Sequence, residues 1–151
     1  MSDSIEKRLQ RLEDIVEIHQ LFIDYGRALD DGDLDRYVSL FSESGQIDLG
    51  PIGRACGREE IRRVMTQALN GLVGSSFHLI TSPQIILEGD TATATVMWTV
   101  IHQDAHGQPQ VTMIGKHHDT LIREHGCWRI ASRRGTIDIP RRYQKPQRPE
   151  T

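Results

Sequence analysis

The sequence predicts an α+β fold, with three helices laid over one face of a curved antiparallel sheet. Apolar residues recur at helical spacing in the first half of the chain, and the pattern changes to alternation near Ser76. The segments after Ser76 are rich in Thr, Val, Ile and Trp, and short links with turn residues join them. Helices followed by consecutive hairpins are typical of the α+β class.

The first helix is predicted over residues 5–29, where apolar residues recur every three or four positions. Charged residues fill the gaps in its first turns, so we expect these turns at the surface and the last turns in the core. The run from Asp30 to Asp33 ends the helix, because Gly32 tolerates a left-handed backbone and Asp33 can cap the next element.

Two further helices and a short strand are predicted before Ser76. The second helix carries four apolar residues at helical spacing: Leu34, Tyr37, Val38 and Phe41. It ends at Ser44-Gly45, and residues 47–49 are predicted as a short strand. Gly57 opens the third helix, whose first-turn acids complement the helix dipole and which ends by Gly71.

Four long strands follow as a predicted meander. They span residues 77–87, 91–102, 111–123 and 128–139. The links at Gly89, Gly107 and Gly126 have hairpin chemistry, so sequential strands should pair antiparallel. The expected core residues are Ile18, Phe22, Val38, Phe41, Ile61, Met65, Ile86, Val96, Trp98 and Ile130.

Length and composition limit the classes of function. The 151 residues fit one domain, residues 1–140, followed by a basic, proline-containing tail at 141–151. The net charge of -3 offers no basic footprint for nucleic acid, and no apolar run reaches membrane-spanning length. The N-terminus lacks the apolar core of a signal peptide, which favours the cytoplasm. Cys56 and Cys127 fit no metal pattern and are expected as free thiols.

Common cofactor and nucleophile motifs are missing from the sequence. It has no P-loop, no GxGxxG, no GxSxG and no HExxH. His117 and His118 are adjacent on a predicted strand, so they point to opposite faces and cannot share one ion without a bulge. We therefore expect neither a metal nor an organic cofactor.

An acid–base set remains as the candidate site. Asp30 ends the first helix, and Tyr25 lies on the apolar face of that helix. His78 opens the first long strand, and His117 lies in the middle of the third. If the helix covers the concave face of the sheet, the four converge on one apolar pocket, where a carboxylate would fix the tautomer of an imidazole and raise its basicity. Alternatively, the acids only cap a turn and each histidine faces solvent. The candidate substrate-binding residues are Phe22, Phe41, Met65, Trp98, Met113 and Arg133.

Several motifs together resemble the SnoaL-like group of the nuclear transport factor 2 superfamily. They are Tyr25-x-x-x-Leu29-Asp30-x-x-Asp33, Phe41, His78 at a strand start, Gly115-x-x-x-Asp119 and Gly126-x-Trp128-Arg129-Ile130. This resemblance covers about residues 8–138. It implies a cone, in which a curved sheet wraps around the helices as a cystatin-like α+β barrel with the pocket at its wide end. In the dehydratase and dehydrochlorinase branches, an Asp–His pair matches Asp30 and His78.

The resemblance implies a cofactor-independent dehydratase-type lyase, or an isomerase, that acts on a hydrophobic cyclic or polyketide-like molecule. His78 would be the general base and Asp30 would orient it. Tyr25 and His117 would hydrogen-bond the carbonyl or leaving oxygen.

A second interpretation is a non-catalytic ligand-binding or assembly module of the same fold, such as a dioxygenase β subunit. A hydrogen-bonded Asp30–His78 pair in an enclosed pocket would favour the enzyme. Apolar residues on both faces of strand 91–102 predict a homo-oligomer, a dimer or a trimer.

Overall fold

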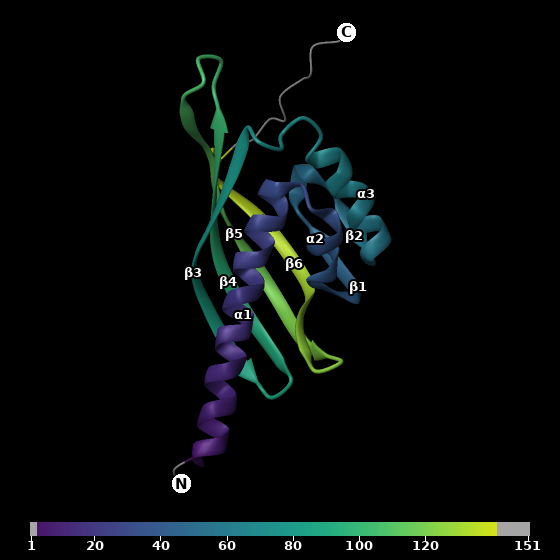
Figure 1. Ribbon diagram of the computed structural model, residues 1–151, viewed down its shortest axis with the longest axis vertical. Coiled ribbons are helices and arrows are strands. Elements are labelled where there is room, and N and C mark those ends of the chain that lie inside the picture. Colours follow the sequence, from purple (N-terminus) through teal and green to yellow (C-terminus); the bar gives the residue numbers. More distant parts are fainter. Residues whose placement is uncertain (1–2, 142–151) are drawn as a thin grey trace.

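The computed structural model describes residues 3–141, which form helices followed by a curved, open sheet (Figure 1). The helices are α1 (Ile5–Asp31), α2 (Leu34–Ser39), α3 (Arg58–Ala68) and the 3₁₀ turn η1 (Gly50–Ile52). The strands are β1 (Phe41–Asp48), β2 (Arg54–Cys56), β3 (Ser76–Glu88), β4 (Thr91–Gln103), β5 (Pro109–Glu124) and β6 (Cys127–Ile139). Apart from Arg141, the predicted basic tail lies outside the described residues.

Local capping defines where α1 and α2 begin and end. The Ser4 side chain accepts the backbone N–H of Lys7 at 3.3 Å. At the other end, Gly32 adopts a left-handed backbone with φ of 68° and ends the helix, as predicted. The last helical residue is Asp31, two residues after the predicted one. The Asp33 carboxylate accepts the N–H of Arg36 at 3.0 Å and so caps α2 immediately.

The predicted fold class is confirmed, and one part of the sheet differs from the prediction. Strands β3 to β6 form the expected antiparallel meander, within the strand order β2-β1-β6-β5-β4-β3. Phe41, predicted in the second helix, instead begins β1, which pairs parallel with β6 in register with Ile130. The sheet is therefore mixed. Without β1, the edge of β6 would leave backbone N–H and C=O groups unpaired, and β1 pairs with them. The helical spacing of nearby residues cannot indicate this nonlocal pairing.

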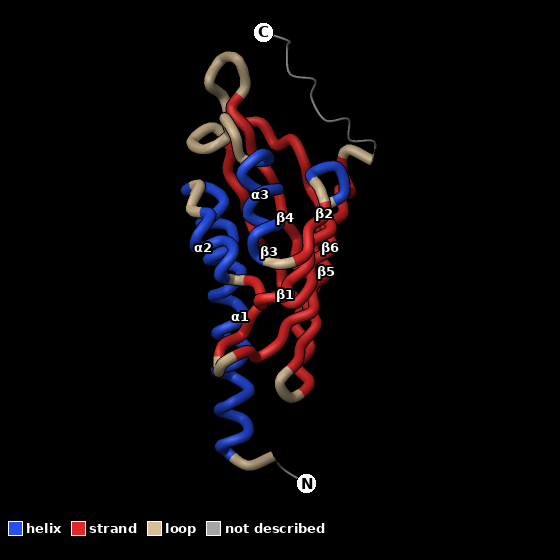
Figure 2. Tube along the Cα trace, turned by 90° about the vertical axis from the view of Figure 1, so that its right-hand side faces the viewer, coloured by secondary structure: helices blue, strands red, loops and turns tan. Residues whose placement is uncertain are grey.

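The helix α1 lies along one face of the sheet, and its N-terminal turns extend beyond the strands (Figures 1 and 2). We call the face of the sheet that α1 covers the inner face, and the opposite one the outer face. Asp14 fastens the middle of α1 to β5 and β6, because its carboxylate accepts from Trp128 Nε1 at 3.1 Å and Arg123 Nη2 at 2.7 Å. Among residues 3–141, no helix has the length and apolar character that crossing a membrane requires.

A bulge in β3 overturns one core prediction. Between Thr81 and Gln84, β3 contains one residue more than β4, and Ser82 has φ of 51°. The extra residue reverses the alternation, so Ile85 packs against the core and Ile86 is 62% exposed. The other predicted core residues are buried: Ile18, Phe22, Val38, Phe41, Ile61, Met65, Val96, Trp98 and Ile130.

Gly115 gives the inner face room for a large ring. It pairs with Trp98 on the neighbouring strand. A Cβ at Gly115 would meet the carbonyl oxygen of Thr136 and would lie 2.5 Å from Cζ2 of Trp98. The missing side chain therefore lets the indole lie across β5.

We predict that Gly115→Ala lowers the free energy of unfolding by about 1–3 kcal/mol, because the added methyl overpacks the strand. The control is Gly135→Ala, whose Cβ would meet Leu49 Cδ2 at 3.1 Å and should cost less. Urea denaturation of both variants measures the difference. Since removing a glycine alone favours folding by restricting the unfolded chain, a Gly115→Ala protein as stable as wild type would refute the steric account.

Candidate functional site

A close approach of α1 to β3 brings together the acid and the base predicted from the sequence. A Cβ at Gly26 would lie 3.0 Å from Ile80 Cγ1 and 3.6 Å from the carbonyl oxygen of His78, so glycine permits this approach. One turn later, Oδ1 of Asp30 accepts the backbone N–H of His78 at 2.9 Å and lies 2.8 Å from its Nδ1. The two side chains are 19% and 18% exposed, which leaves them partly desolvated but reachable.

The Asp30 contact selects one tautomer of His78. An ionised carboxylate can only accept hydrogen bonds, so Nδ1 must carry the proton that faces Asp30. The other ring nitrogen, Nε2, is then left with its lone pair when the imidazole is neutral. This arrangement gives His78 the geometry of a general base, with its charge compensated after it takes up a proton.

A cluster of rings and one guanidinium lies further along the inner face. The rings of Trp98 and His117 stack with their centroids 5.8 Å apart, and the ring of Tyr25 meets His117 edge-on at 5.5 Å. The guanidinium carbon of Arg133 lies 4.1 Å from the centre of the Tyr25 ring. We call Tyr25, Trp98, His117 and Arg133 the inner cluster; two are predicted catalytic residues and two are predicted substrate-binding residues.

Asp119 holds the charge of Arg133 inside the protein. Its carboxylate oxygens accept from Nε at 2.8 Å and from Nη2 of Arg133, and both side chains are fully buried. Burial disfavours the guanidinium charge, but the Asp119 carboxylate outweighs it and raises the pKa of Arg133. The Arg133 guanidinium therefore stays charged, and two parallel hydrogen bonds fix the geometry of the pair.

Three buried polar atoms of the inner cluster have no hydrogen-bond partner in the described chain. They are Trp98 Nε1, His117 Nδ1 and Arg133 Nη1. Most buried polar groups in folded proteins are paired, and leaving one unpaired costs about 1–3 kcal/mol. Three such atoms on neighbouring side chains indicate a place where a polar ligand atom or water completes the hydrogen bonding.

His117 is neutral in this environment. Burial and the charge of Arg133, with smaller contributions from His78 and His118, hold the pKa of His117 well below its usual 6.5. A neutral imidazole can still donate through one ring nitrogen.

The tyrosine Tyr37 belongs to the same group of side chains, although the sequence indicated only its apolar role. Its hydroxyl donates to the Tyr25 oxygen at 3.3 Å, which leaves the Tyr25 hydrogen for another acceptor. Burial and Tyr25 raise the pKa of Tyr37 well above 10, so its hydroxyl stays protonated. Asp119 was also missed as a site residue; its alternation in phase with Gly115 and His117 was the available signal.

The remaining predicted substrate-binding residues fall at different places. Phe22 lies against the guanidinium of Arg133, 5.8 Å from ring centre to carbon. Met113 pairs with Val100, which pairs with His78, so strand register puts Met113 in the inner-face row of the base. Phe41 contacts the ring of Tyr37, and Met65 contributes to the core from α3.

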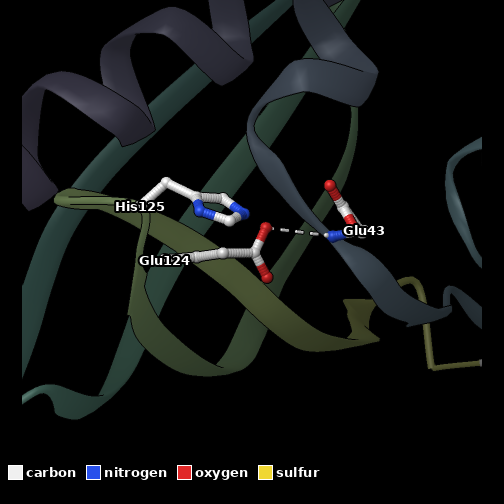
Figure 3. A group of neighbouring side chains, drawn as sticks. All are labelled: Glu43, Glu124 and His125. Atoms are coloured by element: carbon white, nitrogen blue, oxygen red, sulfur yellow. Dashed lines mark hydrogen bonds between the residues drawn. The ribbon is translucent and has the colours of Figure 1, made fainter.

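A hollow and a group of possible cation ligands lie outside the inner face. A depression of about 310 Å³ lies on the outer face, lined by Gln84, Ile86, Thr93, Ala94, Thr95, His118, Asp119 and Thr120. Figure 3 shows Glu43 of β1 beside Glu124 and His125 at the β5–β6 turn, with ligand atoms within 4.8 Å of one another. These three could each offer one ligand to a cation, but they lie at the surface and away from the inner cluster.

Solved structures share this architecture of helices over a curved mixed sheet. An NTF2-like protein with a cystatin-like fold from Novosphingobium aromaticivorans is 26% identical, with a TM-score of 0.85 over 93% of this chain and 94% of that chain. A candidate scytalone dehydratase from the same species is 19% identical, with a TM-score of 0.74 over 85% and 87% of the two chains. The likeness to the candidate scytalone dehydratase concerns the fold alone. The fold of this chain is that of the NTF2-like proteins.

The sequence profile of the SnoaL-like domain matches residues 10–134. This chain therefore belongs to the SnoaL-like family, as its motifs predicted. An uncharacterised protein of Mycobacterium tuberculosis is 28% identical over 124 residues, which span 81% of this chain and 84% of that protein.

The neutral His117 predicts a pH dependence of stability. As the pH falls, the unfolded chain binds a proton at this histidine before the folded chain does, because the folded pKa is lowered. Relative to His117→Gln, the wild-type free energy of unfolding should therefore fall below about pH 6.5, by up to about 1.4 kcal/mol per pH unit. Denaturant unfolding of both proteins at several pH values measures this, and a difference that does not change with pH would contradict a buried neutral His117.

Proposed function

We propose that this protein is a cofactor-independent lyase of the dehydratase type, or an isomerase, acting on a hydrophobic cyclic small molecule. The observation that carries the proposal is the 2.8 Å contact between Asp30 and His78 Nδ1. It leaves Nε2 of His78 free to accept a proton, and it lies on the face of the sheet that also bears the inner cluster. The apolar and aromatic side chains near the pair support a hydrophobic substrate, either cyclic or polyketide-like.

The first step would be removal of a proton next to a carbonyl group by Nε2 of His78. The C–H electron pair forms a C=C bond while the carbonyl π pair moves to the oxygen, which gives an enolate. The Asp30 carboxylate compensates the positive charge of the imidazolium. In a dehydration, the enolate expels a β-hydroxyl, which leaves as water with the proton from His78. In an isomerisation, the proton returns to another carbon. Either course balances within the substrate and the protein.

The inner cluster would stabilise the enolate oxygen. Arg133 Nη1 and Trp98 Nε1 are buried donors without partners among residues 3–141, and they would need no rearrangement when charge develops. His117 can add a neutral donor, and Tyr25 a hydroxyl. Because Asp119 already neutralises Arg133, a neutral substrate fits this site better than a carboxylate.

A non-catalytic binding or assembly module of the same fold stays the alternative. It would need the fold and an apolar ligand site, but it would give no reason for Asp30 to face a ring nitrogen of His78. The hydrogen-bonded, partly desolvated pair meets the first half of the expectation for an enzyme, a paired acid and base, and supports a general base at this place.

The general-base role predicts proton exchange even before the natural substrate is known. When a panel of cyclic ketones is incubated with the protein in D₂O, some of the ketones should gain deuterium at the α-carbon. Mass spectrometry of the ketones measures this gain. His78→Gln should slow this exchange about 10²–10⁴-fold, the usual contribution of a general base. Asp30→Asn should also lose most of it, because the amide holds the ring without compensating its charge.

The matched control is His118→Gln, which changes a histidine of β5 that lies on the outer face, next to His117. It should keep full exchange, and circular dichroism should show all three variants folded. Exchange that persists in His78→Gln would remove the mechanism. Binding of ketones with no exchange in wild type would favour the binding module.

We also propose that the outer face is covered by another copy of the chain. It exposes large apolar side chains: Phe77, Leu79, Ile86 and Met97. Monomeric proteins seldom expose large contiguous apolar patches, so several exposed apolar side chains on one sheet face support an interface.

The double variant Leu79→Glu/Ile86→Lys should weaken this association, whereas Ile52→Lys, which changes an exposed residue of η1, should not. Sedimentation equilibrium at micromolar concentration measures both. A wild-type protein that sediments only at its monomer mass of 17.2 kDa would refute the proposal.

A further inference from the structure

The helix α1 carries a second apolar stripe that residues 3–141 leave uncovered. Its members are 50–80% exposed: Ile5, Leu9, Leu12, Val16 and Ile23. We call these five residues the α1 stripe. They are aligned along most of the helix, because successive members are four, three, four and seven residues apart.

The α1 stripe faces away from the protein. Tyr25, which is buried against the inner cluster, lies nine residues after Val16. Nine residues make two and a half helical turns, so Tyr25 and Val16 point in opposite directions. The stripe is thus separate from the helix face that packs on the sheet.

Within the described part of the chain, the N-terminal part of α1 packs against no other element. Every residue from 5 to 13 is exposed, and Figures 1 and 2 show these turns beyond the ends of the strands. Helices owe most of their stability to packing of an apolar face, and short unsupported ones are marginal in water. A helical extension with an apolar stripe indicates a partner that packs there.

The spacing of the α1 stripe is the heptad pattern of a two-stranded coiled coil. Leu9, Val16 and Ile23 occupy a positions, and Ile5 and Leu12 occupy d positions. Val16 and Ile23 at a with Leu12 at d are the combination that favours two parallel helices, whereas Ile5 at d and Leu9 at a do not follow it.

We propose that the α1 stripe pairs with the same stripe of a second copy of this chain, as a short parallel coiled coil. Charge selects this occupant and this direction. Arg8 holds a g position and Glu13 the following e position, so each Arg8 faces Glu13 of the second copy in a parallel pair. An antiparallel pair would instead bring Glu6 and Glu13 of the two copies together, and like charges there repel.

This contact is separate from the proposed outer-face association. The outer face lies on the far side of the sheet from α1, so one chain can make both contacts at once (Figure 2). The tests therefore use full-length protein that carries Leu79→Glu/Ile86→Lys, in which the α1 contact remains.

Disulfide trapping tests the register directly. Both native cysteines are free, so they are first changed, as Cys56→Ser and Cys127→Ser. In that background, Leu12→Cys should form a covalent dimer rapidly on mild oxidation, because equivalent d positions meet in a parallel pair. Arg11→Cys is the control, since it is also exposed but lies off the stripe. Equal trapping of the two variants, or none with Leu12→Cys, would overturn the proposal.

A charge swap then tests the direction of pairing. Glu13→Arg should raise the dissociation constant about tenfold, because two attractive pairs become repulsive. The double variant Arg8→Glu/Glu13→Arg should restore it, with helix content unchanged by circular dichroism. If Glu13→Arg tightens the association, the helices pair antiparallel and the proposal is wrong.

Discussion

The buried ion pair between Asp119 and Arg133 is the interaction on which the inner face depends. It holds a guanidinium inside the core, where that group packs against the rings of Phe22 and Tyr25. Its positive charge helps to keep His117 neutral. Breaking a buried pair by removing one partner typically costs about 3–5 kcal/mol, because the other charge is left uncompensated. Nη1 of Arg133 has no partner among residues 3–141, so the interaction that stabilises the core also leaves one buried donor available.

The helix α1 links this core to both ends of the molecule. At its C-terminal end, Gly26 permits the close approach that puts Asp30 beside His78. In its middle, Asp14 ties it to Trp128 and Arg123. At its N-terminal end it leaves the sheet altogether, with apolar side chains on the side away from the core. One continuous helix therefore supports the candidate site and offers a surface for assembly.

The errors in predicting elements arise where nonlocal contacts override local pattern. Phe41 has helical spacing from Leu34 and Val38, yet it begins β1, because the free edge of β6 needs a partner strand. Ile86 continues an alternating run, yet the bulge at Ser82 turns it outward. Tyr37 reads as an ordinary apolar helix position, and only folding brings its hydroxyl to Tyr25.

The sequence by itself determined the fold class, the stop of the first helix at Gly32, the four-stranded meander and the family, because these follow from periodicity, turn residues and short motifs. It also indicated Asp30, His78, Tyr25 and His117 as one set, through their positions at a helix end and on alternating strands. Only the tertiary structure decided which atoms meet: the tautomer of His78, the partner of Arg133 and the three buried polar atoms without a partner among residues 3–141. Those depend on strand register and on how closely α1 approaches β3, which are distances between segments far apart in the chain.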